Sequence, residues 1–104
     1  MNKTDILRTA EECITVDRQA THGEAEENFS RIALLWSAYF DCDYMFDAKD
    51  VAAMMVLFKM ARFKANPSHP DNMIDACGYA AFAGEMGMNV EKKSKAIAPV
   101  FSDY

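Results

Sequence analysis

Acidic residues with helical spacing occur at two places in this chain. Glu24 and Glu27 form an E-x-x-E pair where an apolar helix is expected to begin, and Asp71 and Asp75 are four residues apart in a later helix. Residues at these spacings share one helix face, so each pair presents both carboxylates to the same side. Carboxylate oxygens suit Mg²⁺, which keeps several waters and is shared with substrate phosphates. The two pairs therefore predict a magnesium site.

Each acid also has a structural explanation. Glu24 and Glu27 favour the positive end of a helix dipole, and Asp71 is expected in the first turn of its helix, where it has the same effect. Asp75 is different because it is expected in the middle of a helix and buried. A buried Asp is rare unless it is paired or binds a metal. Asp75 is therefore the leading single candidate for a functional residue.

Two cations, Lys59 and Arg62, border the apolar stripe of the helix that precedes Asp71. They are one turn apart and lie outside any run of charges. One interpretation is a clamp for phosphate groups, and the other is a pair of ion pairs with acids of a neighbouring helix, Asp75 above all. Both interpretations predict that the two cations face carboxylates rather than open solvent.

Composition narrows the class of protein. The chain has 104 residues and a net charge of −5, which argues against direct binding of duplex nucleic acid through phosphate neutralisation. Eight methionines suit helix–helix interfaces and favour a homo-oligomer, a dimer or tetramer. Three widely spaced cysteines, with no C-x-x-C pair, indicate a reduced, cytoplasmic protein. We expect no signal peptide and no membrane span, because no 18-residue apolar stretch occurs.

Hydrophobic periodicity predicts four helices and no strand. The first follows Thr4 as its cap; the second runs from near Glu24 to Phe40; the third starts at the cap Asp47 and ends before residues 66–70; the fourth runs from Asp71 to an end at Gly87 and Asn89. We expect an all-α, four-helix bundle-like single domain over residues 1–104, with a core at 4–87 and a C-terminal arm at 88–104.

The apolar residues of the middle helices suggest how they pack. The second helix is apolar over too much of its circumference for a one-sided surface helix, so we expect it to be central or shared between subunits. In the third helix the expected buried stripe consists of Val51, Met54, Met55, Phe58 and Ala61.

Three strings together resemble a family of small uncharacterised phage and prophage proteins. They are DRQATHGEAEENFSRIALLWSAYF, DVAAMMVLFKMARF and DNMIDACGYAAFA, and they cover residues 17 to about 86. That family is in turn distantly similar to the MazG-type all-α nucleotide pyrophosphohydrolases. Those enzymes hold Mg²⁺ with acids of adjacent helices and cleave nucleoside triphosphates to monophosphate and pyrophosphate.

The resemblance implies residue roles. Glu24 and Glu27 match the E-x-x-E of those enzymes, and Asp75 matches the last acid of their E-x-x-D, although Asn72 stands where that motif has Glu. Glu27 and Asp75 would be catalytic, and the metal ligands would be Glu24, Glu27, Asp71 and Asp75. The substrate-binding set would be Lys59, Arg62, Asn28, Trp36 and Tyr79, of which Trp36 and Tyr79 also suit a hydrophobic core.

Two functions are consistent with these features. The first is an Mg²⁺-dependent nucleoside triphosphate pyrophosphohydrolase encoded by a phage or prophage and active in the host cytoplasm. The alternative is a non-enzymatic helical phage protein that binds a host protein or a nucleotide signal, for example to inhibit an antiphage defence system.

Overall fold

The protein is all-helical in the computed structural model, which describes residues 1–17, 25–41 and 43–95. Its elements are α1 (Lys3–Glu12), a π-helical turn η1 (Cys13–Asp17), α3 (Ala25–Phe40), α4 (Ala48–Ala65) and α5 (Asp71–Lys95). These ranges contain no strand, so the all-α, bundle-like prediction is confirmed. A search of the same residues finds no helix with both the length and the hydropathy to cross a membrane.

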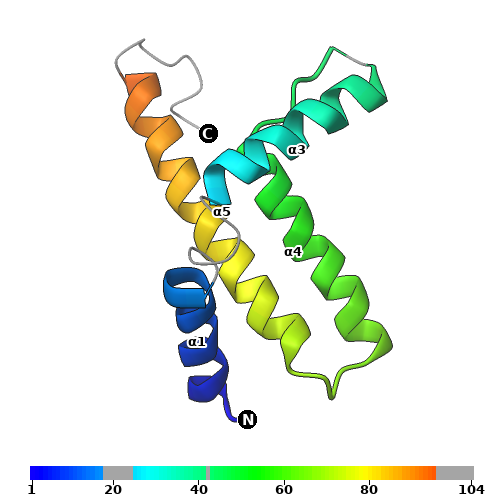
Figure 1. Ribbon diagram of the computed structural model, residues 1–104, viewed down its shortest axis with the longest axis vertical. Coiled ribbons are helices and arrows are strands. Elements are labelled where there is room, and N and C mark those ends of the chain that lie inside the picture. Colours follow the sequence, from blue (N-terminus) through cyan, green and yellow to red (C-terminus); the bar gives the residue numbers. More distant parts are fainter. Residues whose placement is uncertain (18–24, 42, 96–104) are drawn as a thin grey trace.

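The helices pack around α5, which lies between α1 and α4 (Figure 1). A short turn joins α4 to α5, and these two form the most extensive contact in the molecule. By contrast, α3 crosses the beginning of α4 and extends away from the other helices, so that α3 and α4 enclose an open corner (Figure 1). The radius of gyration is 15.5 Å, whereas a compact domain of 100 residues has about 13 Å. The single chain is therefore elongated, with principal extents of 45 × 30 × 29 Å.

Side-chain caps fix the starts of two helices. The Asp50 amide donates to the Asp47 carboxylate and the Asp47 amide donates to the Asp50 carboxylate, both at 3.1 Å, so the predicted cap of α4 is confirmed as a reciprocal capping box. At α1 the cap is Asn2, whose side-chain oxygen accepts from the Asp5 amide at 2.8 Å. The prediction of Thr4 as cap is therefore wrong, because Asn2 and Asp5 already form a capping box that begins two residues earlier.

The end of α5 also differs from the expectation. Gly87 and Asn89 do not stop the helix, which continues to Lys95. A glycine inside a helix costs only about 1 kcal/mol relative to alanine. The residues that follow, among them Glu91, Lys92 and Lys93, are good helix formers, so the helix continues through this weak point.

Small residues make up much of the core. The central cluster consists of Phe29, Ala33, Ala48, Val51, Ala52 and Met86, with Val51 and Ala52 fully buried. The predicted buried stripe of α4 is therefore wrong in part: Val51 is buried and Met55 half-buried, but Met54, Phe58 and Ala61 are exposed. The reason is that α4 turns the side with Ala48, Ala52 and Lys59 inward and leaves its larger apolar residues outside.

Candidate functional site

The strongest polar contact between helices joins Lys59 of α4 to Asp75 of α5. Their Nζ and Oδ2 atoms are 2.8 Å apart. Lys59 is buried with 9% of its surface exposed, whereas the Asp75 side chain is 36% exposed. The prediction that Lys59 faces an acid is confirmed, but the prediction that Asp75 is well buried is wrong. The buried member is the cation, because the long Lys59 side chain crosses the α4–α5 interface to meet a carboxylate near its edge.

Arg62 has a different environment. Its guanidinium carbon lies 4.9 Å from the centre of the Phe58 ring, an exposed cation–π contact of the kind that contributes about 0.5–1 kcal/mol. Within the described part of the chain Arg62 forms no ion pair, so the prediction that it faces a carboxylate is wrong. The reason is rotation: Arg62 is exposed at the end of α4, and only Lys59 points at α5.

The two aspartates of α5 have separate partners. Asp71 lies in the first turn, 69% exposed, with an oxygen 3.4 Å from Nε2 of His69. Asp75, one turn later, is held by Lys59. Asp71 therefore has the structural role that its position in the sequence suggests, that of an acid in the first turn of a helix. Of the two aspartates, Asp75 is the one that forms an ion pair with another helix.

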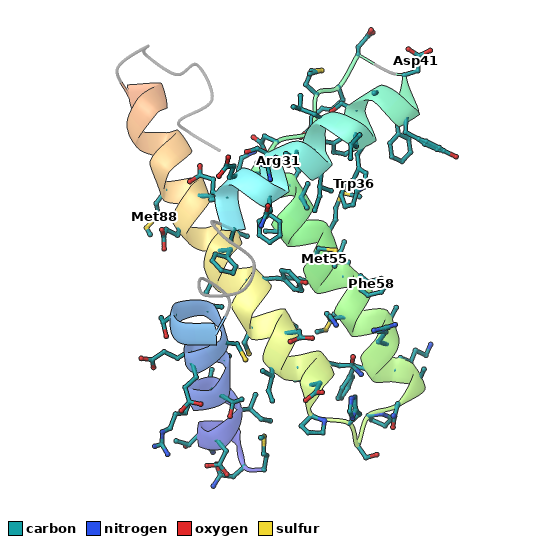
Figure 2. All side chains as sticks on the ribbon, viewed as in Figure 1. Arg31, Trp36, Asp41, Met55, Phe58 and Met88 are labelled. Carbon is teal, nitrogen blue, oxygen red and sulfur yellow. The ribbon has the colours of Figure 1, made fainter. Side chains whose placement is uncertain are left out.

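The acidic start of α3 packs on α5 just after Asp75. Phe29 is buried there, with its ring centre 6.0 Å from that of Tyr79 and 5.8 Å from that of Phe82. Glu27 is exposed and forms an ion pair with Arg31 at 3.1 Å, and Arg31 also donates to the side-chain oxygen of Asn28. Glu24 lies outside the described residues. The beginning of α3 thus lies against α5 (Figure 2), where it contacts the turn that carries Tyr79 and Phe82.

A small hollow opens beside this turn, between η1 and α5. Its volume is about 20 Å³, enough for a water molecule, and its lining consists of Cys13, Ile14, Ile74, Asp75, Gly78, Tyr79 and Phe82. Gly78 makes the close packing possible: a Cβ placed there would lie 3.1 Å from Cγ2 of Ile14. Among the predicted site residues, Asp75 and Tyr79 are the two that share this hollow.

No group of three or more His, Cys, Asp or Glu side chains that could hold a metal ion occurs in the described residues. Glu27, Asp71 and Asp75 therefore do not form a ligand cage by themselves. Mg²⁺ characteristically uses one or two carboxylates together with waters and substrate phosphates. A magnesium site here would rest on Asp75 and on the E-x-x-E pair, of which Glu24 lies outside these residues.

The two aromatic candidates pack against the core. Trp36 is half-buried and meets Phe46 edge to face, with ring centres 6.2 Å apart. Tyr79 is half-buried and packs on the central cluster. Both positions agree with the packing role that their residue types suggested.

One charged cluster was not singled out from the sequence beyond its capping residues. At the start of α4, Lys49 donates to Asp47 at 2.9 Å and the Tyr44 hydroxyl donates to Asp50 at 2.8 Å. Partial burial opposes ionisation of Asp47, but hydrogen bonds from Lys49 and the Asp50 amide outweigh it and lower the pKa of Asp47. The hydrogen bond to Asp47 raises the pKa of Lys49, and the one to Asp50 raises the pKa of Tyr44. The cluster completes a helix cap.

These features define an all-α protein in which an ion pair joins α4 to α5 and an aromatic cluster joins α3 to α5. The chain belongs to a family of unknown function, described as Domain of unknown function (DUF6378), which matches residues 5–87.

Two relatives come from mycobacteriophages. The chain is 43% identical over 88 residues to the Gene 55 protein of Mycobacterium phage L5, an alignment that covers 85% of this chain and 56% of that protein. It is 40% identical over 75 residues to the Gene 55 protein of Mycobacterium phage D29, covering 72% of this chain and 48% of that protein. The chain thus spans about half the length of these curated relatives. No solved structure matches the chain. The predicted kinship with phage proteins of unknown function is confirmed.

Proposed function

We propose that this protein binds nucleotide phosphates with Mg²⁺ at the junction of α3 and α5 and hydrolyses nucleoside triphosphates to monophosphate and pyrophosphate, as MazG-type enzymes do. The observation that carries the proposal is the packing of Phe29 on Tyr79 and Phe82, at 6.0 and 5.8 Å. This contact packs the start of α3 on the part of α5 that begins one turn after Asp75, the acid that the MazG resemblance selects.

The residues have distinct roles in this proposal. Glu24, Glu27 and Asp75, with Asp71 nearby, would hold Mg²⁺, which neutralises phosphate charge and lowers the pKa of a bound water. Lys59 keeps the Asp75 carboxylate in place across the interface and adds positive charge next to it. Arg62, exposed at the end of α4, contributes to phosphate binding, and Asn28, Trp36 and Tyr79 contact the nucleoside.

The direct test is hydrolysis by the purified full chain. Each ribo- and deoxyribonucleoside triphosphate is incubated with the protein and Mg²⁺, and the products are separated by anion-exchange chromatography. We expect monophosphate and pyrophosphate, with Asp75→Asn lowering the rate at least about 100-fold because it removes a charged ligand. Glu85→Gln, which removes one exposed carboxylate elsewhere on α5, is the matched control and should keep the rate.

A second candidate is a non-enzymatic phage protein that binds a host protein or a nucleotide signal, such as an inhibitor of an antiphage defence. The Lys59–Asp75 pair favours it, because a half-buried Asp that already has a cation 2.8 Å away needs no metal to explain it. Under both functions we expect the chain to act as a homo-oligomer.

Thermal unfolding with and without Mg²⁺ separates the two. If Asp75 ligates the metal, Mg²⁺ raises the Tm of the wild type, and Asp75→Asn abolishes that increase. If Asp75 serves only Lys59, the wild type shows no response to Mg²⁺ and Asp75→Asn lowers the Tm in both conditions. The second pattern, together with no hydrolysis of any nucleotide, would reject the enzyme.

A further inference from the structure

Large apolar side chains are exposed along α3 and α4, the two helices that form the corner. Leu35, Tyr39, Met54, Leu57 and Phe58, which we call the α3–α4 face, are 69%, 80%, 37%, 68% and 46% exposed. Figure 2 shows Trp36, Met55 and Phe58 lining this corner. Leu35 and Tyr39 flank Trp36 along α3, and Met54 and Leu57 adjoin Met55 and Phe58 along α4.

The spacing of these residues is that of helix–helix seams. Leu35 and Tyr39 are four residues apart, as are Met54 and Phe58, and Leu57 completes the second stripe. Exposed alanines continue both stripes, Ala38 on α3 and Ala61 on α4. Apolar residues at i, i+3 and i+4 form the ridges that pack into the grooves of another helix. Each of the two helices therefore presents a second packing surface, in addition to the one that it uses inside the chain.

The area of the face matches what a dimer needs. With about 150–250 Å² for a fully exposed large side chain, the five residues expose roughly 450–750 Å² of surface. The largest apolar patch of a typical monomer is about 300–600 Å², and a stable interface buries about 800 Å² on each partner. The face thus lies at the upper end of what a monomer usually leaves in water and approaches one half of a standard interface.

Charge also favours a second copy of the same chain. No Asp or Glu occurs in residues 28–40 or 51–65, although the chain has a net charge of −5. Burial of the face therefore desolvates no carboxylate of these segments. The acids lie in other segments of the sequence, so the two apolar stripes themselves bring no carboxylates of the two copies together.

We propose that the α3–α4 face is the interface of a two-fold symmetric homodimer, in which α3 and α4 of two copies form a four-helix bundle. The two-fold symmetry lets one face serve as its own partner, since every contact is made twice. The inference uses none of the ligands assigned to the magnesium site, so it holds whether the protein is the enzyme or the binding protein.

The test is the mass of the full chain in solution, measured by sedimentation equilibrium or light scattering. The protein concentration is varied over about 1–100 µM, a range that includes micromolar dissociation constants. We expect twice the chain mass of 11.7 kDa for the wild type. Leu35→Lys and Leu57→Lys place a charge in the seam and should each weaken association at least about 100-fold, giving the mass of one chain. Helical circular dichroism verifies that these variants fold.

Leu7→Lys and Met88→Lys are matched controls. Leu7 on α1 is 62% exposed and Met88 on α5 is 60% exposed, and neither belongs to the face. Both variants should keep the dimer mass. A wild type with the mass of a single chain would overturn the proposal, and so would a dimer that persists in Leu35→Lys and Leu57→Lys. Although Trp36 lines the corner, the proposed metal ligands lie outside the face, so a monomer that hydrolyses nucleotides would refute the interface alone.

Discussion

The inner and outer sides of α4 follow opposite rules of packing. On the inner side, the buried positions are Ala48, Val51, Ala52 and Lys59, three small apolar residues and one paired cation. On the outer side, Met54, Leu57 and Phe58 face solvent. Small residues allow helices to approach closely, and large apolar residues contribute most of their stabilisation only when buried. A single copy therefore buries only part of its large apolar side chains.

Helix α3 shows the same division. Its inner side buries Phe29, Ala33 and Ser37, and the Ser37 hydroxyl accepts a hydrogen bond from the Phe46 amide that ties the following loop to the helix. Its outer side carries Leu35 and Tyr39, each more than two-thirds exposed. The contrast between the two sides can be measured directly by matched substitutions.

The largest contrast should come from Phe29 and Tyr39. Phe29→Ala removes a ring that is 6% exposed and contacts both Tyr79 and Phe82, and should lower the free energy of unfolding by about 3–5 kcal/mol. Tyr39→Ala should change the stability of the dissociated chain by no more than about 0.5 kcal/mol. Urea denaturation at low protein concentration gives both values. Equal losses for the two variants would refute the distinction between the two sides.

The next effect concerns the polar contact on the inner side. Asp75→Asn leaves the buried Lys59 amine without its anion, and we expect a loss of about 1–3 kcal/mol, below the value for a fully buried pair because Asp75 is 36% exposed. Lys59→Met combined with Asp75→Asn should recover much of this loss, since the methionine needs no partner. Urea denaturation of both single variants and the double variant yields the coupling energy, and a coupling near zero would show that the pair does not stabilise the fold.

A smaller effect on stability is expected at the start of α4, where the contacts lie within the helix cap and not between helices. Asp47→Ala removes the cap and should cost about 1 kcal/mol. Because the folded-state pKa of Asp47 is lowered from 3.8, its ionisation stabilises the fold above that pH, and this contribution is lost as the pH falls through the lowered value.

Asp47→Asn is the control for the cap. It retains a capping side chain but has no ionisable group. Its stability should therefore change less than that of the wild type as the pH falls from about 5 to about 2. Thermal unfolding across this range measures the difference. A parallel decline of both proteins would assign the acid sensitivity to other carboxylates.

The smallest expected effect compares two glycines of α5. A Cβ at Gly84 would meet nothing within 4 Å, so Gly84→Ala should stabilise the helix by about 0.5–1 kcal/mol. At Gly78 the same change puts a Cβ 3.1 Å from Ile14, so the gain in helix propensity should be offset by displacement of η1. Calorimetric Tm values of the two variants test this, and an equal increase would show that the η1–α5 contact is loose.

Local features of the sequence determined the helices. The apolar spacing, the Asp47–Asp50 cap and the break at residues 66–70 predicted α3, α4 and α5 with starts near those observed, since these signals act over a few residues. The same local signals wrongly favour Thr4 over Asn2 as the first cap. They also predict an end at Gly87, which α5 passes because one glycine costs less free energy than the continued helix gains.

Tertiary structure alone decided which face of each helix is covered. The stripe of Met54, Phe58 and Ala61 has the same helical spacing as a buried stripe, yet it lies outside, because α5 packs on the side with Ala52 and Lys59. Of the two cations one turn apart, only Lys59 points at α5 and reaches Asp75, while Arg62 lies over Phe58. Spacing defines which residues share a face, but the rotation of a helix about its axis depends on its neighbours, and that is set only when the chain packs.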